Sequence, residues 1–248
     1  MSLIEATNII SPAKLTLSLR ITGQREDGYH FIEAEMVTID LADSMTLKKG
    51  ERKVTYQGEY PIEPPPEEDL VMRALDLVDE DLTITVHKRI PPKGGLGGGS
   101  GNAAAVLRYF KHEDIEKAVK LGADVPFNLN GGRALVRGVG EIIEPLQYQE
   151  RVFTLITPDF GCSTVDVYKK WDSLGGPVGP NGNDLEPAAL NVCPDLSLWK
   201  DKLEKHTGVT AKLAGSGSTW FVEGNFPGQG FLTARTLRPF SEEHVREY

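Results

Sequence analysis

The residues with the clearest chemical potential form a glycine-rich run that leads directly into a predicted helix. Six of the 26 glycines lie within 94–101, and the spacing of Ala103, Val106 and Phe110 predicts that a helix follows. The N-terminus of a helix offers unpaired N–H groups and a positive dipole end, and glycines let phosphate oxygens approach the backbone closely. The preceding segment, 82–90, alternates like a strand. This strand–loop–helix order predicts a phosphate site built mainly from main-chain donors.

The residues at the start of this helix narrow the type of phosphate loop. A P-loop requires Gly-Lys-Ser/Thr there, whereas this chain has Ser-Gly-Asn. A dinucleotide-binding Gly-x-Gly-x-x-Ala pattern can be aligned at 99–104, with Asp124 as the ribose ligand, but two prolines and a lysine separate the strand from the glycines. The His-Arg-Asp and Asp-Phe-Gly signatures of protein kinases are absent from the sequence. The loop therefore fits none of these three classes well.

The chain is acidic, but its negative charge is concentrated in one segment. Among 248 residues, 36 acidic side chains exceed 27 basic ones, for a net charge of -9. The segment 63–81 holds eight of the acidic side chains and only Arg73 as a base, so it contributes -7 of this charge. A phosphate site is therefore expected away from this segment. The acidity also disfavours non-specific binding to nucleic acid, which depends on basic side chains.

Composition and cysteine usage predict a globular protein of the cytoplasm. Hydrophobic residues make up 40% and charged residues 25% of the chain, as in ordinary globular domains. No apolar run approaches the roughly 18 residues of a membrane span, and the first residues lack the pattern of a signal peptide. Cys162 and Cys193 are too few for a disulfide framework. The histidines have no metal-like spacing, so no metal held by protein ligands is expected, and the sequence does not indicate an oligomeric state.

Alternating and helical spacings together predict an α+β fold. The run 14–22 alternates apolar and polar residues, which predicts a strand buried on one face only. A hairpin is expected around Gly50, and helical spacing recurs at 70–78. The pattern changes near residue 150, so we expect two domains, 1–149 and 150–248.

Five sequence motifs in a fixed order resemble those of the galactokinase–homoserine kinase–mevalonate kinase superfamily. They are Pro12-Ala13-Lys14-Leu15, Asp27-Gly28-Tyr29-His30, the segment 90–104, Leu121-Gly122-Ala123-Asp124-Val125-Pro126-Phe127 and Asn183-Asp184-Leu185-Glu186-Pro187. Within the superfamily the motifs are most similar to those of the kinases that act on a cytidine diphosphate-linked methylerythritol. The resemblance extends over residues 8–223.

This resemblance implies a two-domain small-metabolite kinase with its active site in the cleft between the domains. Such an enzyme transfers the γ-phosphate of ATP to the C2 hydroxyl of the methylerythritol moiety, in non-mevalonate isoprenoid precursor biosynthesis. Mg²⁺ is expected as the partner of ATP rather than as an ion caged by the protein. Two alternatives stay open, a homoserine- or mevalonate-type kinase of the same superfamily and a nucleotide-binding homologue without catalytic activity.

The resemblance also implies roles for the residues of the reaction centre and the nucleotide site. Asp124 matches the catalytic aspartate that accepts or orients the hydroxyl proton, and Lys14 matches the lysine that pairs with it. Without the resemblance, Asp124 ahead of Pro126 is equally typical of a helix N-cap. ATP is expected to lie along Lys93, Gly94, Gly95, Leu96, Gly97, Gly98, Gly99, Ser100, Gly101 and Asn102.

Four further residues match the substrate site of these kinases. Tyr29 and His30 match a pair that packs on the cytosine and hydrogen-bonds it, which an aromatic face and an imidazole suit. Thr164 and Tyr168 match a threonine and an aromatic residue, and their spacing places them on one face if the segment is helical. Core packing is the competing interpretation of Tyr168.

At four positions the chain departs from the superfamily pattern. Gly101 replaces a serine, Lys93 replaces a glycine, and Thr16 and Asp69 each replace an asparagine. The contacts of these four residues in the folded chain decide whether other groups replace the usual side chains.

Overall fold

Two β-sheets organise the part of the chain that the computed structural model describes, residues 6–61, 63–112 and 114–240. The strands of the first sheet are β1 (Thr7–Gln24), β2 (His30–Lys49), β3 (Lys53–Gly58), β4 (Leu82–Lys88), β5 (Arg133–Gly138) and β6 (Ile142–Pro145). Those of the second are β7 (Val152–Ile156), β8 (Lys212–Leu213), β9 (Trp220–Glu223) and β10 (Leu232–Arg235). The first sheet has the order β3-β4-β2-β5-β6, with β1 paired to β2, and the second has the order β10-β7-β9-β8.

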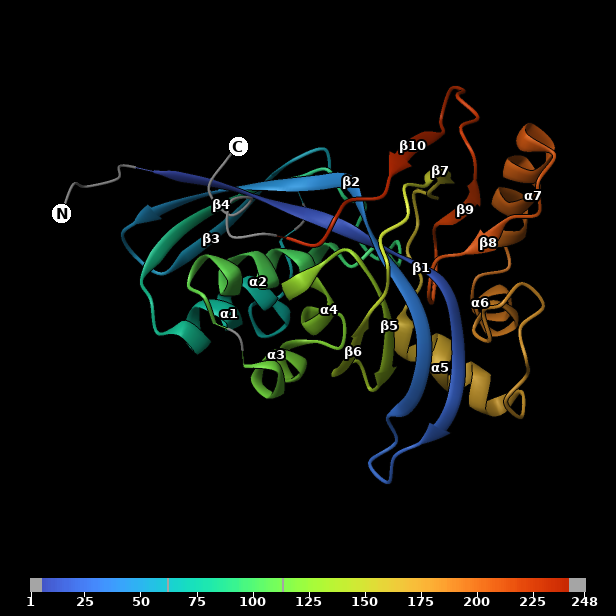
Figure 1. Ribbon diagram of the computed structural model, residues 1–248, viewed down its shortest axis with the longest axis horizontal. Helices are drawn as coiled ribbons and strands as arrows, with labels where there is room; N and C mark the ends of the chain where they lie inside the picture. The colour runs from blue at the N-terminus through green and yellow to red at the C-terminus, as the bar shows by residue number, and fades with distance from the viewer. Residues whose placement is uncertain (1–5, 62, 113, 241–248) are drawn as a thin grey trace.

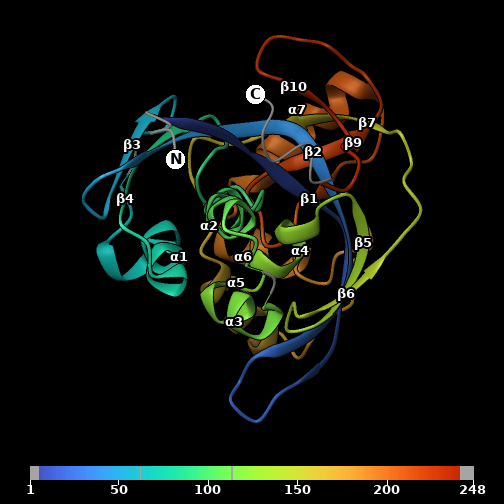
Figure 2. The same cartoon turned by 60° about the vertical axis from the view of Figure 1, so that its left-hand side comes forward.

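The helices pack on these sheets in two groups. They are α1 (Leu70–Val78), α2 (Gly98–Tyr109), α3 (Ile115–Leu121), α4 (Val125–Asn130), α5 (Thr164–Ser173), α6 (Glu186–Val192) and α7 (Leu196–Thr207), with a short 3₁₀ turn, η1 (Pro66–Glu68). Helices α1 to α4 lie on one side of the first sheet, and α7 lies beside the second (Figure 1). Helix α2 lies between α1 and α4 and under β1 and β2 (Figure 2). The predicted α+β class is confirmed.

The long antiparallel hairpin of β1 and β2 contributes to every part of the hydrophobic core. One end packs against α1, α2 and α3 through residues such as Met45. Its middle, around Leu15, packs against Leu96 of the glycine loop and against the second sheet. The other end, around Leu19, packs against α5 to α7. This hairpin is therefore the common scaffold on which both halves of the chain are placed.

The predicted single buried face of β1 is wrong around residues 14–16, because the polar face is buried there too. Lys14 is 5% exposed and Thr16 is 1% exposed. The glycine loop covers Lys14, whose N–H donates to Leu96 O at 3.0 Å. A Cβ built on Gly215 would lie 3.7 Å from both Lys14 Nζ and Thr16 Oγ1, so a second loop covers the same face. The strand thus presents a lysine to the interior.

The predicted hairpin around Gly50 is also wrong, because β4 lies between β2 and β3. Strand β4 pairs antiparallel with β2 and parallel with β3. A parallel pair needs a crossover connection, and α1 lies within the one that joins β3 to β4. The inward residues of β4, Leu82, Ile84 and Val86, are all buried, whereas β3 has no buried residue. The more apolar strand therefore takes the central position and β3 takes the edge.

The two expected domains remain a proposal. The boundary between 149 and 150 falls in the connection from β6 to β7, and every strand of the second sheet follows it. After β10, however, the chain returns to the first sheet, where Leu237 N–H donates to Thr38 O at 2.8 Å. The two halves are consequently joined by packing and by main-chain hydrogen bonds.

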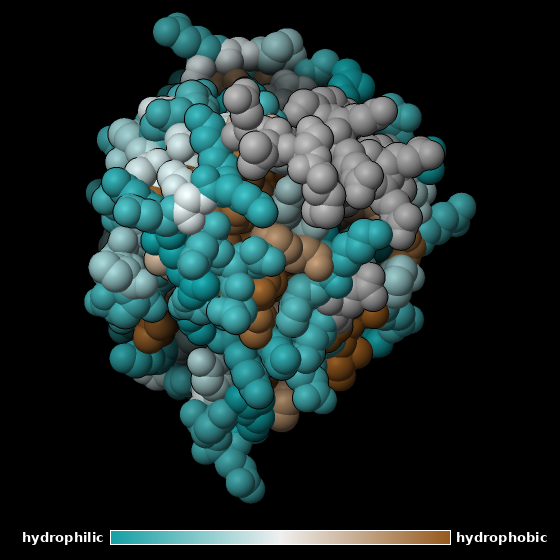
Figure 3. Space-filling view, turned by 90° about the vertical axis from the view of Figure 1, so that its left-hand side faces the viewer, coloured by the Kyte–Doolittle hydropathy of each residue, from teal (hydrophilic) through white to brown (hydrophobic). Residues whose placement is uncertain are grey.

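Surface and helix composition complete the description of the fold. The face shown in Figure 3 is mostly hydrophilic, with hydrophobic residues visible only in small separate areas. Among the residues that the structure describes, no helix has both the length and the apolar character needed to cross a membrane.

Candidate active site

A buried lysine and an aspartate form the centre of the site. Lys14 Nζ lies 3.2 Å from Asp124 Oδ2, and their side chains are 6% and 29% exposed. Lys14 also donates to Thr16 Oγ1 at 3.0 Å. Thr16, which replaces the usual asparagine, therefore holds the ammonium group together with Asp124. Because the carboxylate is the more exposed partner, it is the group that a ligand can reach.

Asp124 stands at the N-cap position of α4, as the competing interpretation predicted, but its side chain makes no capping hydrogen bond. Its backbone is held instead, since Asn128 donates to Asp124 O from both its N–H, at 3.2 Å, and its Nδ2, at 2.8 Å. A Cβ on Gly140 would lie 2.2 Å from Ala123 O, so the β5–β6 turn packs closely on the neighbouring residue. The main chain fixes Asp124 and leaves its carboxylate for Lys14.

The glycine loop packs between β1 and the segment 213–219. Gly94 O accepts from Thr219 N–H at 3.1 Å. Gly95 has φ +76° and Gly97, the N-cap of α2, has φ +69°, so both need the conformational freedom of glycine. No side chain caps α2. The N–H groups of its first turn therefore remain available to an anion, next to the Lys14 side chain that Gly97 touches.

The structure places a second buried lysine beside the loop, one that the sequence interpretation missed. Lys88 is 8% exposed and forms an ion pair with the fully buried Asp43. A Cβ on Gly98 would lie 3.1 Å from Lys88 Nζ, which puts this cation at the start of α2. The signal was present in the sequence, because Lys88 continues the inward alternation of Leu82, Ile84 and Val86.

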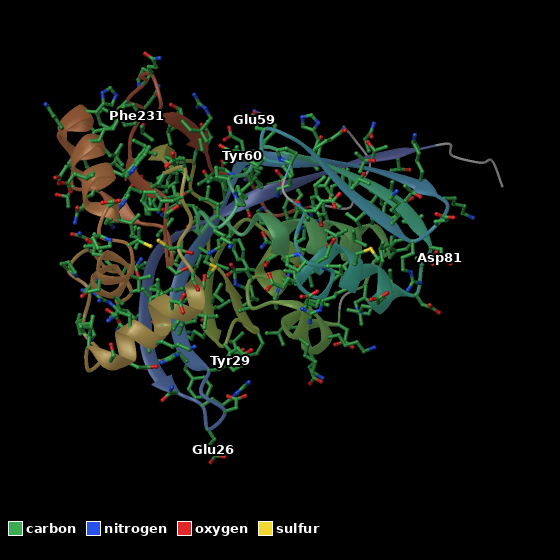
Figure 4. The ribbon with its side chains drawn as sticks, turned by 180° about the vertical axis from the view of Figure 1, so that it is seen from behind. Glu26, Tyr29, Glu59, Tyr60, Asp81 and Phe231 are labelled. Atoms are coloured by element: carbon green, nitrogen blue, oxygen red, sulfur yellow. The ribbon has the colours of Figure 1, made fainter. Side chains whose placement is uncertain are left out.

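The four substrate residues predicted from the sequence lie on the hairpin end and on α5. His30 Nε2 lies 2.8 Å from Asp172 Oδ1. The His30 ring stacks on Tyr168, with centroids 5.0 Å apart, so Tyr168 is part of this aromatic group rather than only a core residue. Thr164 Oγ1 and Ser216 Oγ form a hydrogen bond of 2.9 Å. Tyr29 is 61% exposed and lies near Glu26 at the hairpin end (Figure 4).

Two of these groups are connected to the Lys14–Asp124 pair, Tyr168 through its electrostatics and Ser216 through its neighbour Gly215. Burial raises the pKa of the Tyr168 phenol, and the negative charge of the Asp124 carboxylate raises it further. Gly215, next to Ser216, approaches Lys14 from the other side. The glycine loop and the segment around Gly215 thus both lie against Lys14, which pairs with Asp124.

The remaining departures from the superfamily pattern have local explanations. Lys93 adopts φ +54°, a left-handed conformation that explains why glycine is usual there, and its side chain packs against Gly161. A Cβ on Gly101 would lie 2.9 Å from Ser11 Oγ, so a serine at 101 would need Ser11 to move. The Asp69 carboxylate caps α1, because it accepts from the N–H groups of Val71 and Met72. It also accepts from the Tyr56 hydroxyl. Its role in the structure is therefore to start that helix.

The sequence is similar to those of known kinases of one superfamily. The N-terminal domain of the GHMP kinases matches residues 69–132. The 4-diphosphocytidyl-2-C-methyl-D-erythritol kinase of Thermoanaerobacter pseudethanolicus is 40% identical over 242 residues, covering 84% of this chain and 83% of that protein. The kinase of the same name from Alkaliphilus metalliredigens is 34% identical over 250 residues and covers 85% of each chain.

Two solved structures resemble the fold of this chain. A crystal structure of 4-(cytidine 5'-diphospho)-2C-methyl-D-erythritol kinase matches with a TM-score of 0.68 and 29% identity, over 87% of this chain and 89% of that one. Leishmania major mevalonate kinase, solved with R-mevalonate, matches with a TM-score of 0.65 over 96% and 98% of the two chains. At 15% identity the latter likeness concerns the fold alone.

The glycine loop at the start of α2 and the fold of two joined sheets define a kinase of the GHMP superfamily. ATP is the phosphate donor of this class. Within the class, the chain belongs to the 4-diphosphocytidyl-2-C-methyl-D-erythritol kinase family.

Proposed function

We propose that this chain transfers the γ-phosphate of ATP to the 2-hydroxyl of 4-diphosphocytidyl-2-C-methyl-D-erythritol, a step of non-mevalonate isoprenoid precursor biosynthesis. The observation that carries the proposal is the Lys14–Asp124 ion pair, with 3.2 Å between Nζ and Oδ2, next to the glycine loop. A phosphate donor on the loop and a cytidylyl group on the aromatic side would meet at this pair. The cytoplasmic location expected from the sequence stays a prediction.

The residues of the pair have complementary tasks in the proposed reaction. Phosphoryl transfer depends mainly on positioning the reactants and on stabilising charge that develops on the transferred group. Asp124 would accept or orient the proton of the attacking hydroxyl. Lys14 would hold that carboxylate in place and put a positive charge beside the transferred phosphoryl group.

ATP would bind with its phosphates at the start of α2. The first-turn N–H groups supply donors, and Lys88, held by Asp43, supplies a buried positive charge beside Gly98. A Cβ on Gly122 would lie 3.4 Å from Ser100 Oγ, so this hydroxyl faces the turn that leads to Asp124. The Ser100 hydroxyl offers an oxygen ligand of the kind that Mg²⁺ prefers when it arrives with ATP. The bound ion would neutralise phosphate charge.

The direct test is phosphorylation by the purified protein. With ATP and Mg²⁺, we expect conversion of the cytidylyl substrate to its 2-phosphate, followed by ³¹P NMR, and no comparable conversion of mevalonate or homoserine. Turnover of either of those compounds instead would favour the corresponding rival kinase. ATP binding without turnover of any of the three would favour an inactive homologue. Omission of Mg²⁺, with EDTA present, should abolish the reaction.

Replacement of Tyr29 by alanine should weaken binding of the cytidylyl substrate and leave binding of ATP nearly unchanged. Tyr29 is 61% exposed, so loss of its ring costs little stability, whereas loss of base stacking lowers the affinity for the base by about tenfold or more. We therefore expect the KM for the substrate to rise about tenfold and the KM for ATP to change less than about twofold. Glu26→Ala, at the end of the same hairpin (Figure 4), is the matched control. An equal rise of both KM values in Tyr29→Ala would show that the loop has a structural role.

A further inference from the structure

One polar contact at the aromatic end of the site has no counterpart in the sequence motifs. Asp172, in the last turn of α5, places Oδ1 at 2.8 Å from His30 Nε2, across 142 positions of the chain. The His30 side chain is only 7% exposed, and the Asp172 side chain is 44% exposed. The imidazole is thus enclosed by protein while its carboxylate partner reaches solvent.

The His30 ring is fixed on three sides. Tyr168 stacks on its face, with 27° between the ring planes, and Trp171 packs edge-on at 5.5 Å between centroids. Trp171 is itself held by a hydrogen bond of 3.0 Å from its Nε1 to Pro177 O. The Asp172 carboxylate, which contacts Nε2, then fixes the rotation of the ring in its own plane. Among the described residues, His30 Nδ1 has no hydrogen-bond partner.

An ionised carboxylate accepts hydrogen bonds and does not donate them. In the neutral ring the contact with Asp172 therefore requires the proton on Nε2, and Nδ1 carries the lone pair. A carboxylate that holds one nitrogen of an imidazole in this way determines what the other nitrogen can do. Asp172 makes Nδ1 an acceptor.

We propose that Asp172 is a positioning residue that makes His30 selective for cytosine over uracil. Cytosine carries an exocyclic amino group, a donor that an imidazole acceptor matches, whereas uracil carries a carbonyl oxygen at the same position, an acceptor that meets the Nδ1 lone pair unfavourably. The inference rests on the proposed function, because it concerns the base of the proposed substrate. It adds a determinant that acts through His30 and does not touch the reacting atoms.

The tautomer can be measured without any turnover. Long-range ¹H–¹⁵N correlation spectra of histidine-labelled protein in mildly alkaline buffer report which ring nitrogen carries the proton, and a His30→Asn variant assigns the His30 signals. We expect His30 to be protonated on Nε2 alone, and to lose this preference in Asp172→Ala. A proton on Nδ1 in the unchanged protein, or on both nitrogens, would overturn the proposal even if the enzyme phosphorylates its substrate.

The selectivity is measured as the ratio of kcat/KM for the cytosine substrate to that for its uracil analogue. We expect a ratio of about 30 or more in the unchanged protein, because a site built to pair with an amino group rejects an analogue that lacks it. Asp172→Ala should lower this ratio at least about fivefold, through KM, with kcat changed less than about threefold. Asp172→Glu, which keeps a carboxylate, should restore the ratio to within about twofold.

Asp166→Ala, an exposed aspartate on the same helix, is the matched control and should leave the ratio unchanged. An unchanged ratio in Asp172→Ala would overturn the inference and leave the proposed function standing. Absence of turnover with both bases in the unchanged protein would instead refute the proposed function, and the spectra would still decide the tautomer.

Discussion

Asp124→Asn is expected to lower kcat by about 10³-fold and to leave ATP affinity almost unchanged. The substitution preserves the shape of the side chain but removes the negative charge that accepts the hydroxyl proton, a contribution of typically 10²–10⁴-fold. The backbone contacts of Asp124 do not involve the carboxylate, since its side chain makes no capping bond and Asn128 binds its carbonyl. The fold should therefore survive. Steady-state kinetics and calorimetric titration of ATP measure the two effects separately.

Asp114→Asn is the matched control for this prediction. Asp114 is also the N-cap of a short helix, but its side chain does accept a hydrogen bond from the helix, at 3.1 Å from Lys117 N–H. Asparagine caps helices as well as aspartate does, so this variant should keep kcat within about twofold. If Asp124→Asn turned over within tenfold of the unchanged protein, Asp124 would not be the base. Parallel loss of ATP binding would make it a structural residue.

Local sequence patterns were sufficient to predict the parts of the site that are local in space. The glycine spacing and the apolar residues after Asn102 predicted α2 with an uncapped first turn, which the structure has at Gly98–Tyr109. Asp124 ahead of Pro126 predicted the start of a helix, which is α4. Such features depend on backbone conformation within a few residues, and propensities and capping rules act at that range.

Burial of polar residues could not be predicted in the same way, because it depends on which segments pack together. The alternation of β1 gave the correct strand, but it could not show that the loops at 94–101 and 213–217 cover Lys14 and Thr16. The insertion of β4 between β2 and β3 is likewise a long-range choice, made by the apolar residues of β4.

The contact between His30 and Asp172 is the clearest example of a feature that the sequence alone cannot predict. Nothing in either segment indicates the pairing, since it exists only because α5 packs on the end of the hairpin. Sequence reasoning placed His30 in the substrate site by resemblance but could not assign the state of its ring. That state is set by a partner on a distant element, and the partner becomes visible only in the folded chain.

Gly95→Ala is expected to be the most damaging substitution in the glycine loop. An alanine Cβ would lie 2.2 Å from Ala214 O and 2.9 Å from Gly217 O, both main-chain atoms that cannot rotate away. The φ of +76° adds strain of about 1–2 kcal/mol for any residue with a Cβ. We expect the free energy of unfolding to fall by about 3 kcal/mol, a size that such backbone clashes reach. Urea unfolding measures it.

Ligand binding should fall as well, because the clash acts on both walls of the site. Gly95 belongs to the loop proposed to hold ATP, and the atoms it would strike flank Ser216, which bonds Thr164 at 2.9 Å. Calorimetric titration should show that Gly95→Ala lowers the affinity for ATP and for the cytidylyl substrate at least about tenfold.

Gly99→Ala provides the control for stability within the same loop. The nearest atom to its Cβ would be Leu70 Cδ1 at 3.9 Å, and alanine favours the first turn of α2 that Gly99 occupies. Its unfolding free energy should be unchanged or higher. Because both variants add one methyl group to a glycine of the same loop, four residues apart, a difference between them isolates the contact with 214–217. Equal stability of the two variants would show that the loop tolerates a side chain at 95, and that the close packing of the loop on the second half of the chain does not hold the site together.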